Sequence, residues 1–304
     1  MLDALWLWIA TPFEYPFMRT ALGVSAFVGV VCAVLSCFLV LKGWALLGDA
    51  LSHAVLPGVA FAYLLGLPFA VGAFVSGLGG ALAIGWIKRN SRVKEDAVMG
   101  LVFTAFFALG LIVISRTPST VHLTHILYGN VLGIEPGDLV QTLLCGGVAL
   151  AVVAVLRRDL LLFCFDPNHA RAIGLNTALL HYTLLALLAL TVVAALQAVG
   201  LILVIAMLIT PGATASLLTK RFDRMLPIAV ATAVLACVVG VYVSYYLDAS
   251  TGGCIVVAQA IIFFGALLIG SPQSTLARAR QRRRLRAAAP QTVGGRRAAV
   301  GGQQ

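Results

Sequence analysis

The chain contains a series of uninterrupted apolar stretches, several of them longer than the roughly 18 residues that mark a membrane-spanning helix. Of its 304 residues 61% are hydrophobic and only 11% are charged, where a soluble domain carries about a quarter charged residues. A transmembrane barrel is excluded, because its strands would alternate apolar and polar residues. The sequence therefore predicts an all-α, polytopic integral membrane protein and excludes a soluble enzyme.

Lys/Arg clusters and Gly/Pro turns divide the apolar sequence into about nine spans, with eight or ten as alternatives. The expected spans are Met18–Leu41, Trp44–Leu65, Phe69–Ile87, Ala97–Ser115, Leu139–Leu156, Leu179–Leu196, Leu201–Thr219, Met225–Leu247 and Ile255–Ile269. Residues 1–17 then form an extracytoplasmic segment, and residues 18–270 form the transmembrane domain. Residues 271–304 form a basic cytoplasmic tail, which we expect to be disordered because it cannot bury a core.

The basic residues predict one orientation of these spans. With the loop at residues 88–94 in the cytoplasm, 19 of the 21 Lys and Arg residues lie inside and only Arg19 and Arg116 lie outside. An odd number of spans then places the N-terminus outside and the C-terminus inside. The formal charge of +10 is thus explained by the orientation of the spans and by contact of the basic tail with anionic lipid. We expect no nucleic-acid partner.

An Asp and a His four residues apart lie inside the second expected span. On a helix this spacing places Asp49 and His53 on one face, one turn apart. A carboxylate with an imidazole suits a divalent ion such as Mn2+, Fe2+ or Zn2+, and ionisable groups inside a membrane are costly, so the pair is a candidate metal site. Pro57 and Gly58 just beyond can break the helix and free backbone carbonyls. The alternative is that Asp49 caps the helix and His53 is a hydrogen-bonded core histidine.

Two further polar groups are weaker candidates for metal binding. Asp248 begins a cluster of Asp, Ser, Thr and Gly between the last two expected spans, which is also the usual composition of an exposed turn. His122 and His125 form a His-x-x-His pair in the outer connection, where they either meet a metal at its entry or are simply solvated.

The inner connection between Arg157 and Asn176 is too long for a simple turn. Within it Asp166 is expected to cap a short helix that begins at Pro167 and ends at Gly174. A capped helix on the cytoplasmic face suits a docking element, and the alternative is a surface helix that merely links two spans.

None of the four lysines follows the glycines of a phosphate-binding loop, so the chain cannot house a Walker-type ATPase. Any energy source for transport must therefore come from another subunit or from an ion gradient.

The chain resembles the membrane permease subunits of bacterial ABC importers for manganese, zinc and iron, over roughly residues 20–270. Four segments carry the resemblance, in order along the chain: GDALSHAVLPG (Gly48–Gly58), HILYGNVLG (His125–Gly133), FDPNHARAIGL (Phe165–Leu175) and MLITPGATA (Met207–Ala215).

The resemblance implies a helical permease of the bacterial cytoplasmic membrane that pairs with a second copy or a related chain. It further implies two cytoplasmic ATPase subunits, an extracytoplasmic metal-binding protein, and a transported metal ion in place of a permanently bound cofactor. Asp49 and His53 match the family's acidic residue and histidine in the second-span motif, which makes them the candidate ligands of the translocation path. Asp248 matches a family acidic residue, although Ser250 and Thr251 depart from the family's pattern after it. The family's coupling helix, which contacts the ATPase, matches Phe165, Asp166, Pro167, Ala170 and Gly174.

The form of the first segment is closer to the manganese and iron members than to the zinc members, so we expect Mn2+ or Fe2+ as the cargo. A zinc permease of the same family is the nearest alternative. An ion-coupled transporter working without an ATPase is a second alternative, and the lack of a convincing nucleophile or complete metal triad argues against a membrane enzyme.

Overall fold

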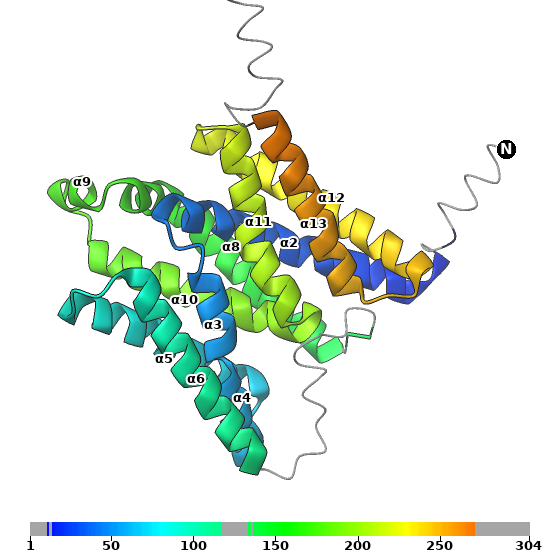
Figure 1. Ribbon diagram of the computed structural model, residues 1–304, viewed down its shortest axis with the longest axis horizontal. Helices are drawn as coiled ribbons and strands as arrows, with labels where there is room; N and C mark the ends of the chain where they lie inside the picture. Colours follow the sequence, from blue (N-terminus) through cyan, green and yellow to red (C-terminus); the bar gives the residue numbers. More distant parts are fainter. Residues whose placement is uncertain (1–10, 12–13, 117–132, 135, 271–304) are drawn as a thin grey trace, which may run out of the picture.

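The computed structural model describes residues 11, 14–116, 133–134 and 136–270 (Figure 1). Within these ranges the regular secondary structure is all helical, and nine helical stretches are long and apolar enough to cross a membrane. The prediction of an all-α, polytopic membrane protein is confirmed. Most of the extracytoplasmic segment at residues 1–17, the pair His122 and His125, and the basic tail at residues 271–304 lie outside the described residues.

The helices follow one another with short connections. They are α2 (Pro16–Lys42), α3 (Leu47–Ala54), α4 (Leu56–Leu65), α5 (Phe69–Asn90), α6 (Glu95–Arg116), α8 (Pro136–Phe165), α9 (Pro167–Ala172), α10 (Thr177–Val199), α11 (Leu201–Leu218), α12 (Phe222–Leu247) and α13 (Thr251–Gly270).

The second expected span consists of two helices, α3 and α4, which meet at Val55. Pro57 has no backbone N–H and so cannot donate to the carbonyl of His53 one turn earlier, which interrupts the helical ladder there. The break predicted from Pro57 and Gly58 is therefore confirmed, and it falls directly after the Asp49 and His53 pair.

Helix α8 is longer than the sequence pattern suggested. We expected this span to end at Leu156, but α8 continues through Arg157 to Phe165, so the first half of the expected inner connection is helical. The reason is local, because three leucines, which are strong helix formers, follow soon after the two arginines and no Gly or Pro interrupts the chain before Pro167.

Helix α2 runs through the middle of the molecule and packs against α8, α11 and α12, while α3, α4, α5 and α6 form a second group beside them (Figure 1). At the contact of α2 with α11, the Ser36 hydroxyl donates to the carbonyl of Ile209 at 3.2 Å and accepts from the Gly212 N–H at 3.0 Å. These bonds satisfy backbone groups of α11 on both sides of Pro211, which has no N–H and cannot donate a backbone hydrogen bond.

Helices α4 and α5 cross at two glycines. A Cβ atom on Gly58 would overlap the carbonyl of Gly72, and a Cβ on Gly72 would overlap the carbonyl of Gly58. The two backbones therefore touch, which is the small-residue packing used between membrane helices.

We expect Gly58→Ala to separate α4 from α5 and to destabilise the protein by about 1–3 kcal/mol, the usual cost of overpacking. Thermal unfolding of the detergent-purified chain measures the effect. Gly79→Ala on α5 is the matched control, because a Cβ there meets nothing within 4 Å. Equal melting temperatures for the two variants would contradict the tight crossing.

Candidate metal-binding site

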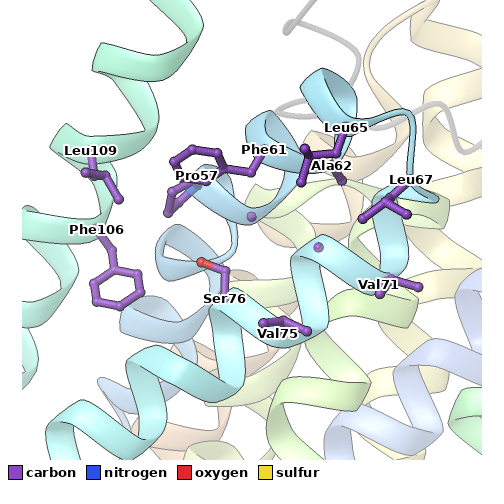
Figure 2. A pocket seen from close by; sticks show the side chains of 12 residues that line it. Pro57, Phe61, Ala62, Leu65, Leu67, Val71, Val75, Ser76, Phe106 and Leu109 are labelled. Atoms are coloured by element: carbon purple, nitrogen blue, oxygen red, sulfur yellow. The ribbon is translucent and has the colours of Figure 1, made fainter.

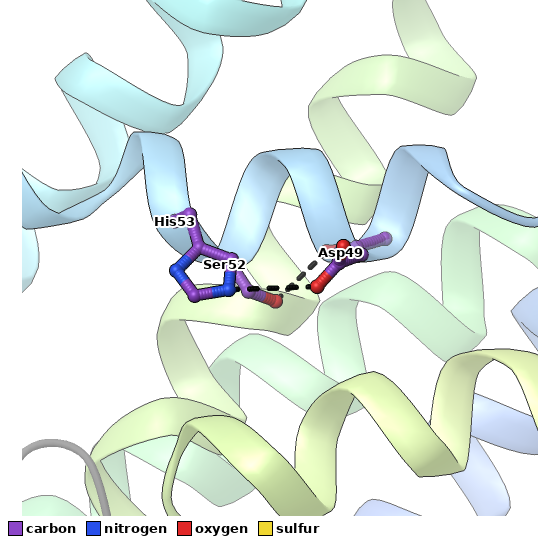
Figure 3. A network of polar contacts seen from close by, with 4 residues as sticks. Asp49, Ser52 and His53 are labelled. Carbon is purple, nitrogen blue, oxygen red and sulfur yellow. Dashed lines mark hydrogen bonds and ion pairs between the residues drawn. The ribbon is translucent and has the colours of Figure 1, made fainter. Parts of the chain in front are cut away.

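Asp49 and His53 lie on one face of α3, as their spacing predicted (Figure 3). The distance from Asp49 Oδ1 to His53 Nε2 is 3.5 Å, and the side chains are 38% and 19% exposed. The two groups thus face each other closely enough for one metal ion to contact both, and neither is sealed inside the chain.

The rest of α3 holds this face in place. Leu47, Ala50 and Leu51 are buried on other sides of the helix, and the Ser52 hydroxyl donates to the carbonyl of Gly48 at 2.8 Å (Figure 3). Asp49 lies in the first turn of α3, where the partial positive charge of a helix N-terminus favours a carboxylate.

Two aromatic rings of α6 enclose the imidazole of His53. Its ring centroid lies 4.5 Å from that of Phe103 and 5.3 Å from that of Phe107, both edge to face. His53 Nδ1 is buried and has no hydrogen-bond partner within the described part of the chain. The aromatic contacts therefore orient the ring so that Nε2 is the nitrogen beside Asp49, and Nε2 is the one a shared metal ion would use.

One nitrogen and one carboxylate are chemically suited to Mn2+, Fe2+ or Zn2+, but they do not complete a coordination sphere. In the described ranges no group of three or more His, Cys, Asp or Glu residues is arranged to hold a metal. Asp49 and His53 by themselves are therefore an incomplete candidate site.

The break after α3 is supported from α5. The Ser76 hydroxyl donates to the carbonyl of Ala54 at 2.6 Å, next to His53 in the chain. Ser76 also borders a cavity of about 340 Å³ between α4, α5 and α6, which is lined largely by apolar side chains such as Phe61, Val75 and Phe106 (Figure 2). That lining does not suit an ion, so we assign the polar role of Ser76 to the α3–α4 junction.

Asp248 lies away from this pair. It is the exposed C-cap of α12, and the connection from α12 to α13 lies at the right of the view, away from α3 (Figure 1). Its φ of +48° and ψ of +44° are left-handed, a conformation that Asp tolerates better than most residues. The geometry accounts for Asp248 as the residue that ends a helix.

The predicted capped helix is present as α9. The Asp166 carboxylate accepts hydrogen bonds from the N–H groups of Asn168 and His169, both at 3.0 Å, and Pro167 is the first residue of the helix. Gly174, with φ of +90°, follows its end. Ala170 is fully buried against the protein, whereas Phe165 is 78% exposed.

Sequence reasoning missed several residues around these two elements. Ile173, just after α9, is an apolar side chain that is 57% exposed, as Phe165 is at the other end. Phe103, Phe107 and Ser76 gave no signal, because an aromatic or a serine in a membrane span is unremarkable until its neighbour is known.

The family model described as the ABC 3 transport family matches residues 14–270. The chain belongs to the ABC 3 transport family. Among curated relatives, the manganese transport system membrane protein MntB of Synechocystis sp. is 58% identical over 268 residues, covering 88% of this chain and 87% of that protein. The chelated iron transport system membrane protein YfeD of Yersinia pestis is 55% identical over 267 residues, with coverages of 88% and 90%.

Among solved structures, a chain of PsaBC from Streptococcus pneumoniae in complex with Fab is 37% identical and superposes with a TM-score of 0.80. The match covers 92% of this chain and 100% of that one. As an ABC 3 family member with nine apolar helices in its described part, the chain is a multi-pass protein of the bacterial inner membrane. It is the membrane permease component of an ABC transport system, in which ATP hydrolysis belongs to a separate subunit.

Proposed function

We propose that this permease moves a divalent transition metal ion, Mn2+ or Fe2+, from outside the cell into the cytoplasm. The observation that carries the proposal is the Asp49 and His53 pair, with Oδ1 and Nε2 3.5 Å apart on a helix of a membrane-spanning bundle. Intramembrane ionisable groups are retained at such cost chiefly where an ion or proton passes.

A second permease subunit completes the site. Two copies, or this chain and a related one, that face each other across α3 bring two carboxylates and two imidazoles together, enough to replace most of an ion's water. A site divided between two subunits binds and releases its cargo as the subunits move apart, whereas a closed site within one subunit would hold the metal.

The choice among metals rests on two kinds of support. The mixed oxygen and nitrogen ligands suit first-row divalent ions in general. Relatives that are named for manganese and iron favour these two over zinc, since the most similar ones described above are 58% and 55% identical to this chain.

The basic residues favour one orientation of the chain in the membrane. With the N-terminus outside and the C-terminus inside, α9 lies at the cytoplasmic face, where it receives the ATPase subunit. An extracytoplasmic metal-binding protein delivers the ion at the other face. The side chains of Phe165 and Ile173 are apolar and exposed, so they can supply the apolar contacts that such a docking helix needs.

The proposed function is tested by uptake of radiolabelled Mn2+ into liposomes that contain the complex of this chain with its ATPase subunit. We expect Mn2+ uptake to require ATP and the binding protein. We also expect Fe2+ to inhibit Mn2+ uptake more strongly than Zn2+ does. Uptake without the ATPase would favour the ion-coupled alternative, and stronger competition by Zn2+ would favour the zinc permease.

A further inference from the structure

Lys42, the last residue of α2, contacts the end of α8 directly. Its Nζ donates to the carbonyl of Phe163 at 3.4 Å and lies 4.2 Å from the centroid of the Phe163 ring. The Phe163 side chain is buried, so the ammonium group meets both the backbone and the π face of one residue in a partly desolvated place.

Phe163 is connected to α9 through a short junction. It lies in the last turn of α8, and one extended residue, Asp166, with φ of −144° and ψ of 93°, separates that turn from α9. The Asp166 N–H donates to the carbonyl of Leu162 at 2.9 Å, and the Ala170 N–H donates to the carbonyl of Asp166 at 3.0 Å. Asp166 is thus hydrogen-bonded to both helices, and a displacement of α9 reaches the last turn of α8 through this one residue.

On its other side Lys42 is joined to α3 through Trp44. Nζ of Lys42 lies 5.8 Å from the Trp44 ring centroid, and Trp44 is buried with its ring edge to face against His181 of α10, at 5.1 Å. The carbonyl of Trp44 accepts from the N–H of Leu47, the first residue of α3, at 3.0 Å.

These contacts form one continuous path from the cytoplasmic helix to the candidate ligands. It runs from α9 through Phe163, Lys42 and Trp44 to the first turn of α3, which contains Asp49. The ends of α2 and α8 lie at the same end of the molecule as α9 (Figure 1). A chain of packed side chains, hydrogen bonds and helices of this kind can carry coupling between two sites.

We infer that Lys42 is a positioning residue that couples movement of the docking helix α9 to the metal-binding helix α3. The inference rests on the proposed function, in which α9 receives the ATPase and α3 binds the metal. Lys42 lies on α2, outside both α3 and α9, so its loss uncouples ATP hydrolysis from transport and leaves both separate activities in place.

The test compares Lys42→Met with Lys42→Arg in the reconstituted complex of this chain, its ATPase and its binding protein. We measure Mn2+ uptake, ATP hydrolysis in the same liposomes, and Mn2+ retention by the complex without ATP. For Lys42→Met we expect about tenfold less Mn2+ transported per ATP, within the about 5–150-fold typical of coupling between sites. Basal ATP hydrolysis and Mn2+ retention stay within about twofold of wild type. Lys42→Arg restores transport, because a guanidinium also stacks on rings and donates to carbonyls.

Lys220→Met is the matched control, since Lys220 is an exposed lysine in the connection between α11 and α12. It should leave the ratio of Mn2+ to ATP unchanged. Phe163→Leu keeps the backbone carbonyl and removes the ring that Lys42 contacts. If Lys42→Met does not assemble, Phe163→Leu tests the coupling role with the same three measurements. The double variant should lose no more coupling than Lys42→Met alone, because both changes break the same contact.

The possible results are separable. A wild-type ratio of Mn2+ to ATP in Lys42→Met, or losses of Mn2+ retention or of ATPase assembly that match the loss of transport, would overturn the coupling role and leave the proposed function standing. A wild-type complex that takes up no Mn2+ would overturn the proposed function, and the role of Lys42 with it.

Discussion

Replacing Asp49 or His53 with Ala is expected to reduce Mn2+ uptake by about 100-fold or more. Under the proposed function each replacement removes a direct ligand of the transported ion, and loss of an outer-shell partner alone commonly costs about 10–100-fold in metal affinity or activity. The Asp49 carboxylate and the His53 imidazole are 3.5 Å apart. Helix α3 has no other carboxylate or imidazole that could replace either of them.

The measurement is initial uptake of radiolabelled Mn2+ by cells that lack other manganese importers, with protein levels checked in the membrane fraction. Asp223→Asn is the matched control, because Asp223 is a carboxylate in an exposed ion pair with Arg157, and such pairs contribute about 0–1 kcal/mol. It should transport at nearly the wild-type rate. If Asp49→Ala or His53→Ala kept wild-type uptake, the pair would not be part of the transport path.

Replacing both Phe165 and Ile173 with Ala is expected to detach the ATPase subunit. These side chains are 78% and 57% exposed at the two ends of α9, although both are large and apolar. An interface anchor of this kind typically contributes about 2 kcal/mol or more, so each replacement should weaken ATPase binding by about 30-fold.

Co-purification of the ATPase with the tagged permease measures this effect, together with ATP-driven Mn2+ uptake. Val155→Ala is the control, because Val155 is 84% exposed on α8 but lies ten residues before Phe165, within the expected membrane span. It should retain the ATPase. Full retention of the ATPase by the double variant would show that α9 is not its docking site.

Much of the architecture follows from local sequence. The nine spans were expected because each is an apolar stretch of sufficient length, and such a stretch must form a helix in lipid to satisfy its own backbone. The short helix α9 was expected in detail, because Asp166, Pro167 and Gly174 each act on the backbone within one turn. The end of α8 was placed too early, because the two arginines near it were taken to mark the end of a helix, whereas the helix continues through them to Phe165.

Only part of the candidate site could be predicted from the sequence. The spacing of Asp49 and His53 predicted that they share a face, because helical periodicity depends on nothing beyond the helix itself. Asp248 was a weaker candidate, since its neighbours also have the usual composition of an exposed turn, and the fold places it at the end of α12.

By itself, the sequence determined the membrane class, the number of spans, the shared face of Asp49 and His53, and the cap of α9. Only the tertiary structure decided that Phe103 and Phe107 enclose His53 and that Lys42 reaches Phe163, 121 positions away in the chain. The physical reason is range. Periodicity, capping and hydropathy act within a few turns of one helix, whereas a contact between helices depends on how whole helices pack, and a single sequence carries no separate signal for that.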